Sequence, residues 1–407
     1  MDGLILGLDL CDAYTQVVCG QGDKSWTLPT VVCKKKTEDL WLVGEAAYAS
    51  ALAGDGVIVD KLVKLVKKDG TATIGGVKYG GMQLLSRFLM QVLELARKEY
   101  GTDHVERLVI TAAKVDQRLL ACLFKCREYL GVAEGNMSVI SHTESFMYYV
   151  LSQKREVWNN QIGMFDLSPD SLCYYEMKVL RGMRRTTVLA EREELEESFS
   201  LDILKTPAGA RLADRILCSC GSRLLQKKAF SSIFLTGKGF EEQEWAKEFM
   251  KLVCARRRVF VESALFALGA AYRAADLTRE KTGYPYVCIC EGRLDSSVTM
   301  KVLHKDQENQ LVLAEAGESW HEAGKEVELI LDKQDYLEFI ITAMDPKKKK
   351  AVRLVLEGFP KRAEKTLRVL LKIGFLDERT MTVMVRDQGF GDFFPSTGAS
   401  IRQEVMI

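Results

Sequence analysis

The chain has 407 residues, more than one hydrophobic core usually supports, so its length predicts two or three folding units. Apolar residues make up 47% of the sequence and charged residues 28%, a composition that excludes wholesale disorder. The formal net charge is +1, so no global electric field draws the chain to nucleic acid or to an anionic membrane.

The eleven cysteines lie mostly within apolar runs, and their close pairs are spaced C-x-C or C-x3-C. These spacings are unlike those of a zinc ribbon or a thioredoxin motif. Their odd number predicts reduced, buried thiols and therefore a cytoplasmic location. The sequence opens on Asp2 and a short apolar strand, and no run reaches the roughly 18 apolar residues that span a bilayer, so we expect neither secretion nor membrane insertion.

The first part of the chain predicts a series of strands followed by alternating helix and strand. Strands are expected at residues 4–10, 15–19 and 26–33, then a strand running into a helix at 40–48, helices at 61–68 and 82–100, a strand at 107–113, a helix at 115–129, a strand at 138–141 and a helix at 144–152. This alternation is typical of a mixed or parallel sheet covered by helices.

A second series begins near residue 161 and follows the same plan. Strands are expected at 162–167, 172–179 and 232–236, with helices at 208–226 and onward to 275. The segment Glu191–Glu197 holds five glutamates in seven residues, which we interpret as a solvated helix face. The predicted boundaries are 1–160 for the first α/β series, 161–284 for the second and 285–407 for a β-rich domain.

The last part of the chain changes to short runs of period two. They lie at 286–291, 297–304, 311–315, 326–332, 336–344, 352–357, 366–375 and 380–387, and they predict a β-sandwich or barrel. Lys347–Lys350 is expected to be a solubilising or edge-protecting turn, with binding of an acidic partner as the alternative. The tail Gly389–Gly398 carries three phenylalanines between glycines, a pattern that favours packing against its own domain, with anchoring of a partner as the alternative.

Five sequence blocks stand in a fixed order. The first block is an apolar strand ending at Asp9, and the second is Leu-Pro-Thr-Val-Val at 28–32 followed by Val-Gly-Glu-Ala-Ala at 43–47. The third is an apolar strand at 107–113, and the fourth is Asp-Leu-Ser-Pro-Asp-Ser at 166–171. The fifth is Leu-Thr-Gly-Lys-Gly-Phe at 235–240 followed by a helix with Gly-Ala-Ala at 262–271. In this order they resemble the actin-like ATPase superfamily, and in particular the DnaK-type heat-shock chaperones. The resemblance covers about residues 3 to 276 and implies a two-lobed α/β fold of ribonuclease H-like repeats.

The resemblance implies a role for each matching residue. Asp9 and Asp166 would organise Mg²⁺ and its waters, and His142 or Glu144 would act on the attacking water. A structural role for His142, as a cap of the turn from strand to helix, is an equal alternative. The remaining implied contacts to ATP or ADP come from Asp12, Thr15, Ser168, Ser171, Gly237 and Gly239.

Several positions depart from the family's pattern. Cys11 stands where a glycine is expected, and Pro169 removes a backbone N–H from the second phosphate loop and fixes its φ. The run Ser-His-Thr-Glu at 141–144 replaces Asn-Glu-Pro-Thr, and only about thirty residues, 180–210, remain where the family has a subdomain that clamps adenine. Cofactor-free and ATP-bound states are therefore equally expected.

These departures favour a DnaK-like protein with weak or lost ATPase activity that acts as a nucleotide-responsive or purely structural interaction scaffold. Its C-terminal β-domain would bind a protein or peptide. One alternative is an active ATP-dependent chaperone-like protein. A second alternative is a filament protein related to actin or FtsA, which the reduced second-lobe subdomain favours and the added β-domain disfavours.

Overall fold

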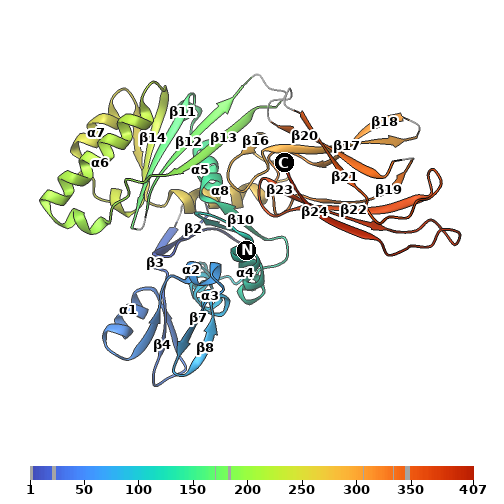
Figure 1. Ribbon diagram of the computed structural model, residues 1–407. Helices are drawn as coiled ribbons and strands as arrows, with labels where there is room; N and C mark the ends of the chain where they lie inside the picture. Colours follow the sequence, from blue (N-terminus) through green and yellow to red (C-terminus); the bar gives the residue numbers. More distant parts are fainter. Residues whose placement is uncertain are drawn as a thin grey trace. The chain divides into compact units, whose positions relative to one another are not determined.

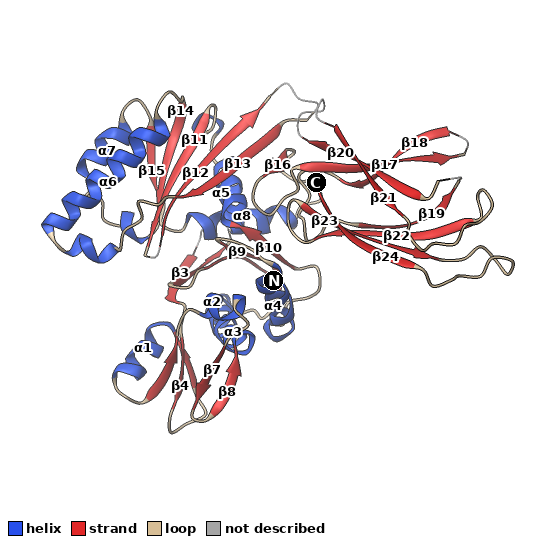
Figure 2. Ribbon diagram, viewed as in Figure 1, coloured by secondary structure: helices blue, strands red, loops and turns tan. Residues whose placement is uncertain are grey.

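The computed structural model describes residues 3–20, 24–169, 171–181, 185–305, 307–332, 334–343 and 349–407. The chain divides into two compact units, Met1–Tyr286 and Val287–Ile407 (Figure 1). Helices and strands alternate in the first unit, whereas strands dominate the second (Figure 2). All eleven cysteines are free thiols. No helix within the described ranges is both long enough and apolar enough to cross a membrane.

The first unit contains two five-stranded arrangements with one topology. The first is β10-β9-β1-β2-β3, formed by β1 (Leu4–Leu10), β2 (Tyr14–Cys19), β3 (Lys24–Pro29), β9 (Val105–Ala112) and β10 (Met137–Ser141). The second is β15-β14-β11-β12-β13, formed by β11 (Gln161–Ser168), β12 (Ser171–Leu180), β13 (Thr187–Glu194), β14 (Phe230–Thr236) and β15 (Arg258–Val261). β1 pairs antiparallel with β2 and parallel with β9, and β11 does the same with β12 and β14.

The helices repeat with the strands. The first half contributes α3 (Gly81–Tyr100), α4 (Gln117–Leu130) and α5 (His142–Leu151), and the second half α6 (Pro207–Leu225), α7 (Lys247–Cys254) and α8 (Leu265–Leu277). In each half one helix precedes the fourth strand, one joins the fourth to the fifth, and one follows the fifth. The two halves therefore share one order of elements as well as one strand order.

Helices α5 and α8 pack closely against each other, and α8 also packs on β1 (Figure 1). A Cβ added at Gly269 would lie 2.0 Å from the carbonyl oxygen of Ser145, and one added at Gly7 would lie 2.2 Å from that of Ala267. The hydroxyl of Ser145 also donates a hydrogen bond to the carbonyl of Phe266 at 2.5 Å. Only glycine permits these approaches, which hold the start of α5 near the end of β1.

An additional group of elements lies between β3 and β9. It comprises β4 (Val32–Lys35), β5 (Trp41–Val43), α1 (Gly44–Leu52), β6 (Gly56–Val59), α2 (Leu62–Lys67), β7 (Thr71–Ile74) and β8 (Val77–Gly80). The single strand predicted at 26–33 is wrong, because the chain leaves the first sheet at Pro29 and enters a three-stranded sheet, β5-β4-β6, at Val32. Proline lacks the N–H that would continue the ladder.

The solvated helix predicted at Glu191–Glu197 is also wrong. Residues up to Glu194 belong to β13, which pairs antiparallel with β12 along its whole length. Val188 and Ala190 on this strand are buried, whereas Glu193 and Glu197 form ion pairs with Arg223 of α6. The glutamates are thus exposed residues at the end of a strand and in the turn after it, so pairing with β12 overrides the charge pattern. Short 3₁₀ turns complete this unit at Arg155–Val157, Leu201–Lys205 and Lys238–Phe240.

The second unit contains two four-stranded antiparallel sheets, β18-β17-β20-β21 and β19-β22-β23-β24 (Figure 2). Their strands are β17 (Ser296–His304), β18 (Gln307–Ala314), β19 (Lys325–Leu331), β20 (Tyr336–Ala343), β21 (Lys349–Val355), β22 (Leu367–Phe375), β23 (Thr380–Asp387) and β24 (Ser400–Met406), with the short β16 (Val287–Ile289) before them. Buried and less buried residues alternate along β20 and β23, as expected of sheets with one core face. The sequence did not predict β24, and part of the predicted lysine turn, Lys347 and Lys348, lies outside the described residues.

The glycine- and phenylalanine-rich tail before β24 does not pack wholly against its own unit. Phe393 is 93% exposed and Phe390 is 38% exposed, while Phe394 lies under the guanidinium of Arg362. The expectation of self-packing is therefore wrong for Phe393. The phenylalanines separate because a tight turn, in which Phe390 N–H donates to the carbonyl of Phe394 at 2.7 Å, directs Phe393 outward.

Candidate functional site

Two buried aspartates occupy equivalent places in the two halves of the first unit. Asp9 on β1 lies opposite Thr111 of β9, and Asp166 on β11 lies opposite Thr236 of β14. Asp9 is 1% exposed and Asp166 is 4% exposed. Each aspartate stands near the end of the first strand of an antiparallel hairpin whose other neighbour is parallel. The repeated topology therefore places two carboxylates where strand ends meet helix beginnings.

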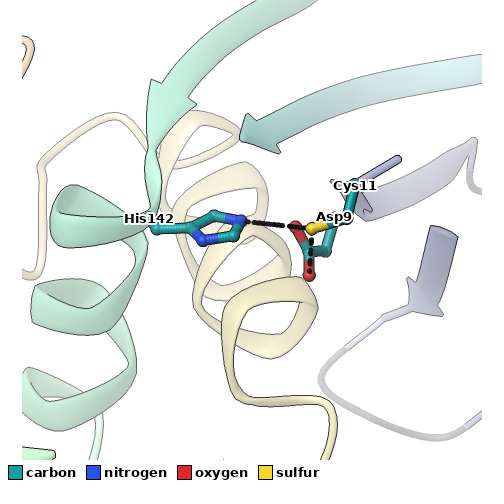
Figure 3. Close-up of side chains that lie close together, drawn as sticks. All are labelled: Asp9, Cys11 and His142. Atoms are coloured by element: carbon teal, nitrogen blue, oxygen red, sulfur yellow. Dashed lines mark hydrogen bonds and ion pairs between the residues drawn. The ribbon is translucent and has the colours of Figure 1, made fainter. Parts of the chain in front are cut away.

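His142 binds the first of these carboxylates. Ser141 caps α5 by accepting a hydrogen bond from the N–H of Glu144 at 3.1 Å, so His142 is the first residue of the helix. Its Nε2 lies 2.7 Å from Asp9 Oδ1 (Figure 3), and its ring stacks on Phe266 with a centroid distance of 3.8 Å. His142 is 3% exposed, and its Nδ1 has no hydrogen-bond partner among the described atoms. The imidazole is thus fixed against Asp9 by packing and by one hydrogen bond.

Cys11 completes a compact cluster with these two residues (Figure 3). Its Sγ lies 3.6 and 3.8 Å from the carboxylate oxygens of Asp9 and 3.9 Å from His142 Nε2. Burial, and then the negative charges of Asp9 and Asp166, raise the pKa of Cys11 well above its ordinary value. The thiol therefore keeps its proton near neutral pH. Cys11 is nevertheless partly exposed, unlike its two partners.

Asp166 has a different environment from Asp9. Its Oδ1 accepts one hydrogen bond, from the hydroxyl of Ser168 at 2.7 Å. Burial raises the pKa of Asp166 to about 6, although the hydrogen bond from Ser168 and the charge of His142 oppose this rise. The same Ser168 hydroxyl lies 3.5 Å from the hydroxyl of Tyr14 on the first hairpin. The two hairpins are therefore neighbours at this point.

The other predicted site residues are not all gathered around these carboxylates. The buried hydroxyl of Thr15 forms a hydrogen bond with the hydroxyl of Thr30 at 2.8 Å. The carboxylate of Asp12 accepts a hydrogen bond from the N–H of Lys64 on α2 at 3.1 Å. Ser171 opens β12 opposite Ser168, and Glu144 is buried in the first turn of α5. Thr15 and Asp12 thus have structural partners, whereas Ser168 donates a hydrogen bond to the buried Asp166.

The two glycines predicted to hold a nucleoside also have partners within the protein. Gly237 has a φ of +89°, and a Cβ on it would lie 2.6 Å from Asp166 Oδ1. A Cβ on Gly239 would lie 2.4 Å from the side chain of Leu167. Gly237 is therefore required by its left-handed backbone and by its contact with Asp166. The turn after β14 packs directly on the end of β11.

Sequence reasoning included Asp9 and His142 in the site but missed Cys11 and Phe266 as parts of it. Cys11 and His142 are separated by 131 residues, so no local spacing connects them. The excluded zinc patterns depend on pairs of cysteines close in sequence, whereas this cluster combines one cysteine with residues on two other elements. The only available signal was a thiol in the turn directly after a strand-end aspartate. The cluster offers one sulfur, one nitrogen and one carboxylate donor, a set suited to a cation.

Comparison with known proteins identifies the family but not an activity. Residues 13–291 match a family of unknown function, DUF5716, in its C-terminal part, and the chain belongs to that family. Residues 293–407 match a domain of unknown function, DUF8552. No curated protein matches the chain. The boundary between the two matches lies close to the boundary between the two compact units.

Proposed function

We propose that this chain is a DnaK-like protein of the actin-like ATPase superfamily that has weak or no ATPase activity and acts as an interaction scaffold. The observation that carries the proposal is the contact of 2.7 Å between His142 Nε2 and Asp9 Oδ1. Asp9 is the carboxylate that would organise Mg²⁺ in an active relative. In this chain the imidazole of His142 already forms a hydrogen bond with that carboxylate.

The repeated topology supports the superfamily assignment. Both halves of the first unit have the strand order expected of ribonuclease H-like repeats, and each carries an aspartate at the same place in its first hairpin. Helices α5 and α8, which end the two halves, pack together. The two antiparallel sheets of the second unit support a β-sandwich for the C-terminal domain.

The surroundings of Asp9 support loss of catalysis. Magnesium requires near-ideal octahedral coordination by oxygen and retains several waters. Around Asp9 the nearest side chains are an imidazole stacked on Phe266 and a protonated thiol, neither of which suits that shell. Gly237 and Gly239 are used for packing against β11. Any ATP or ADP bound with Mg²⁺ through Asp9 and Asp166 would have to displace His142 first.

The tail of the second unit supports a role in binding a protein partner. Asp387 and Arg362 hold the segment 389–397 by a network of hydrogen bonds, and this segment presents Phe393 with 93% of its surface exposed. A fixed backbone with a protruding aromatic side chain loses little entropy when the ring enters an apolar pocket. We therefore assign Phe393 as the anchor for a protein partner that offers such a pocket.

Isothermal titration calorimetry with Mg-ATP tests the loss of nucleotide binding. The expected result is no binding at micromolar concentrations. Micromolar binding by the full chain that is abolished in Asp166→Ala would overturn the proposal and support an active chaperone-like protein. His142→Asn is the matched variant, because it frees Asp9 from the imidazole, and a gain of Mg-ATP binding in this variant would support the assigned role of His142. Light scattering with and without ATP tests the filament alternative, which nucleotide-dependent growth would support.

A further inference from the structure

The cluster of Asp9, Cys11 and His142 contains the three side-chain types that most often bind zinc in proteins. We propose that the three form a zinc site, which takes one Zn²⁺ through Cys11 Sγ, His142 Nε2 and a carboxylate oxygen of Asp9. The fourth tetrahedral position would belong to water. The inference depends on these three donor atoms, and its tests use no nucleotide.

The distances between the donor atoms are close to those that tetrahedral zinc requires. With bonds of about 2.3 Å to sulfur and about 2.1 Å to nitrogen or oxygen, zinc separates its ligands by about 3.3 to 3.6 Å. The Cys11 Sγ to Asp9 Oδ1 distance is 3.6 Å and the Sγ to His142 Nε2 distance is 3.9 Å. The Nε2 to Oδ1 distance of 2.7 Å must open by about 0.6 Å, as the hydrogen bond between them gives way to the metal.

The charges around the cluster favour a cation. Asp9 is buried, and Asp166 is a second buried carboxylate whose charge acts on both Cys11 and His142. The guanidinium of Arg192 on β13 also acts on Asp166, and it donates a hydrogen bond to the sulfur of Cys173. Two buried carboxylates against one guanidinium leave an excess of negative charge, which a divalent ion would neutralise.

The donor set selects zinc over magnesium. Thiolate and imidazole are softer ligands than oxygen, and they suit Zn²⁺, whereas Mg²⁺ and Ca²⁺ take oxygen ligands. On binding, the Cys11 thiol releases its proton to solvent. Nε2 must be unprotonated, so the single imidazole proton resides on Nδ1. Because Nδ1 has no acceptor among the described atoms, we expect an affinity about 10- to 100-fold below that of a site with a complete outer shell.

Titration of the metal-stripped full-length chain with Co²⁺ tests the site, because cobalt bound to a thiolate absorbs in the near ultraviolet. The expected result is a thiolate–cobalt band that saturates at one equivalent and disappears on addition of Zn²⁺ but not of Mg²⁺. Cys11→Ser is expected to lose the band. Cys254→Ser, which removes an exposed thiol at the end of α7, is expected to keep it. Absence of the band in the wild-type chain, or its survival in Cys11→Ser, would overturn the proposal.

A second measurement covers the case in which Cys11→Ser fails to fold. Zinc is expected to raise the thermal unfolding temperature of the wild-type chain by several degrees, since it binds only the folded state. His142→Gln retains a polar side chain of similar length and is expected to lower zinc affinity at least tenfold and to lose most of this rise. An equal rise in His142→Gln and in the wild-type chain would exclude the histidine as a ligand and overturn the proposal.

Discussion

Two buried aspartates, one in each compact unit, have opposite electrostatic environments. Asp387 in the second unit receives hydrogen bonds from the N–H groups of Gly389 and Thr397, from the Thr397 hydroxyl, and from both terminal nitrogens of Arg362. Burial acts to raise the pKa of Asp387, but these bonds lower it below its ordinary value. Among the residues that the structure describes, Asp166 in the first unit receives one hydrogen bond, from Ser168, and burial raises its pKa to about 6.

The different numbers of hydrogen-bond donors distinguish a carboxylate with a structural role, Asp387, from one suited to binding a cation, Asp166. A buried charge with many donors contributes to stability, whereas a buried charge with few donors is costly unless a cation approaches it. Asp387 fixes the segment that presents Phe393, and nothing further is required of it. Asp166, with Asp9, His142 and Cys11 nearby, maintains a negative region at the ends of two sheets. Three predictions test this comparison.

The largest effect is expected from Asp387→Ala. The substitution leaves the Arg362 guanidinium, whose side chain is 6% exposed, without its partner and removes the bonds that hold segment 389–397. Breaking such a buried pair costs about 3–5 kcal/mol of unfolding free energy. Chemical denaturation measures the loss, and hydrogen exchange of residues 389–398 locates it. Glu404→Ala on β24 is a control, because that side chain is exposed. If the unfolding free energy falls no further than in this control, the structural role assigned to Asp387 is contradicted.

A smaller effect, of opposite sign, is expected from Asp166→Asn. The pKa of Asp166 is about 6 in the folded chain against 3.8 for an unburied carboxyl, so between these pH values the folded chain binds more protons than the unfolded one. Stability contributed by the protonated carboxyl is therefore present below pH 3.8 and is lost as the pH rises through about 6. The loss at pH 7 is at most about 3 kcal/mol.

The asparagine variant should remove this pH dependence and equal or exceed the wild-type chain in stability at pH 7. Denaturation curves at several pH values between 4 and 8 would reveal it. The signs for the two aspartates differ, because the lowered pKa of Asp387 gives stability that is lost only as the pH falls through that lowered value. A wild-type chain whose stability rises steadily from pH 4 to pH 7 in a manner that depends on Asp166 would contradict the assigned environment.

The smallest effect on stability is expected from Phe393→Ala. The ring is 93% exposed, so its removal should change the unfolding free energy by less than about 0.5 kcal/mol. If Phe393 anchors a protein partner, the same substitution should weaken that association by about 2 kcal/mol or more. Phe339→Ala, at a fully buried position on β20, is the contrasting variant and should lose stability instead. Co-purification from cells, quantified for wild-type and Phe393→Ala chains, measures the association, and equal recovery would remove the anchor role.

The sequence by itself predicted most of the repeating elements in the first unit, because their apolar periods are long and clear. Helices α3, α4 and α6 and strands β9, β11 and β14 lie within a few residues of the predicted ranges. The failures occurred where a local signal competes with pairing. Glu191–Glu194 became part of a strand, Pro29 ended one that appeared continuous, and β24 was missed because its residues are largely exposed at a sheet edge.

The candidate site was predicted only in part. Asp9, Asp166 and His142 were named through the resemblance to the DnaK-type chaperones, on motifs that lie at strand and helix ends. The contacts among Asp9, Cys11 and His142 could not be predicted, because the parallel pairing of β1, β9 and β10 and the glycine-permitted packing of α8 against β1 and α5 bring them together. The sequence determined which residues stand at the element ends. The tertiary structure decided which of them meet, because long-range packing sets the distances between groups that lie far apart in the chain.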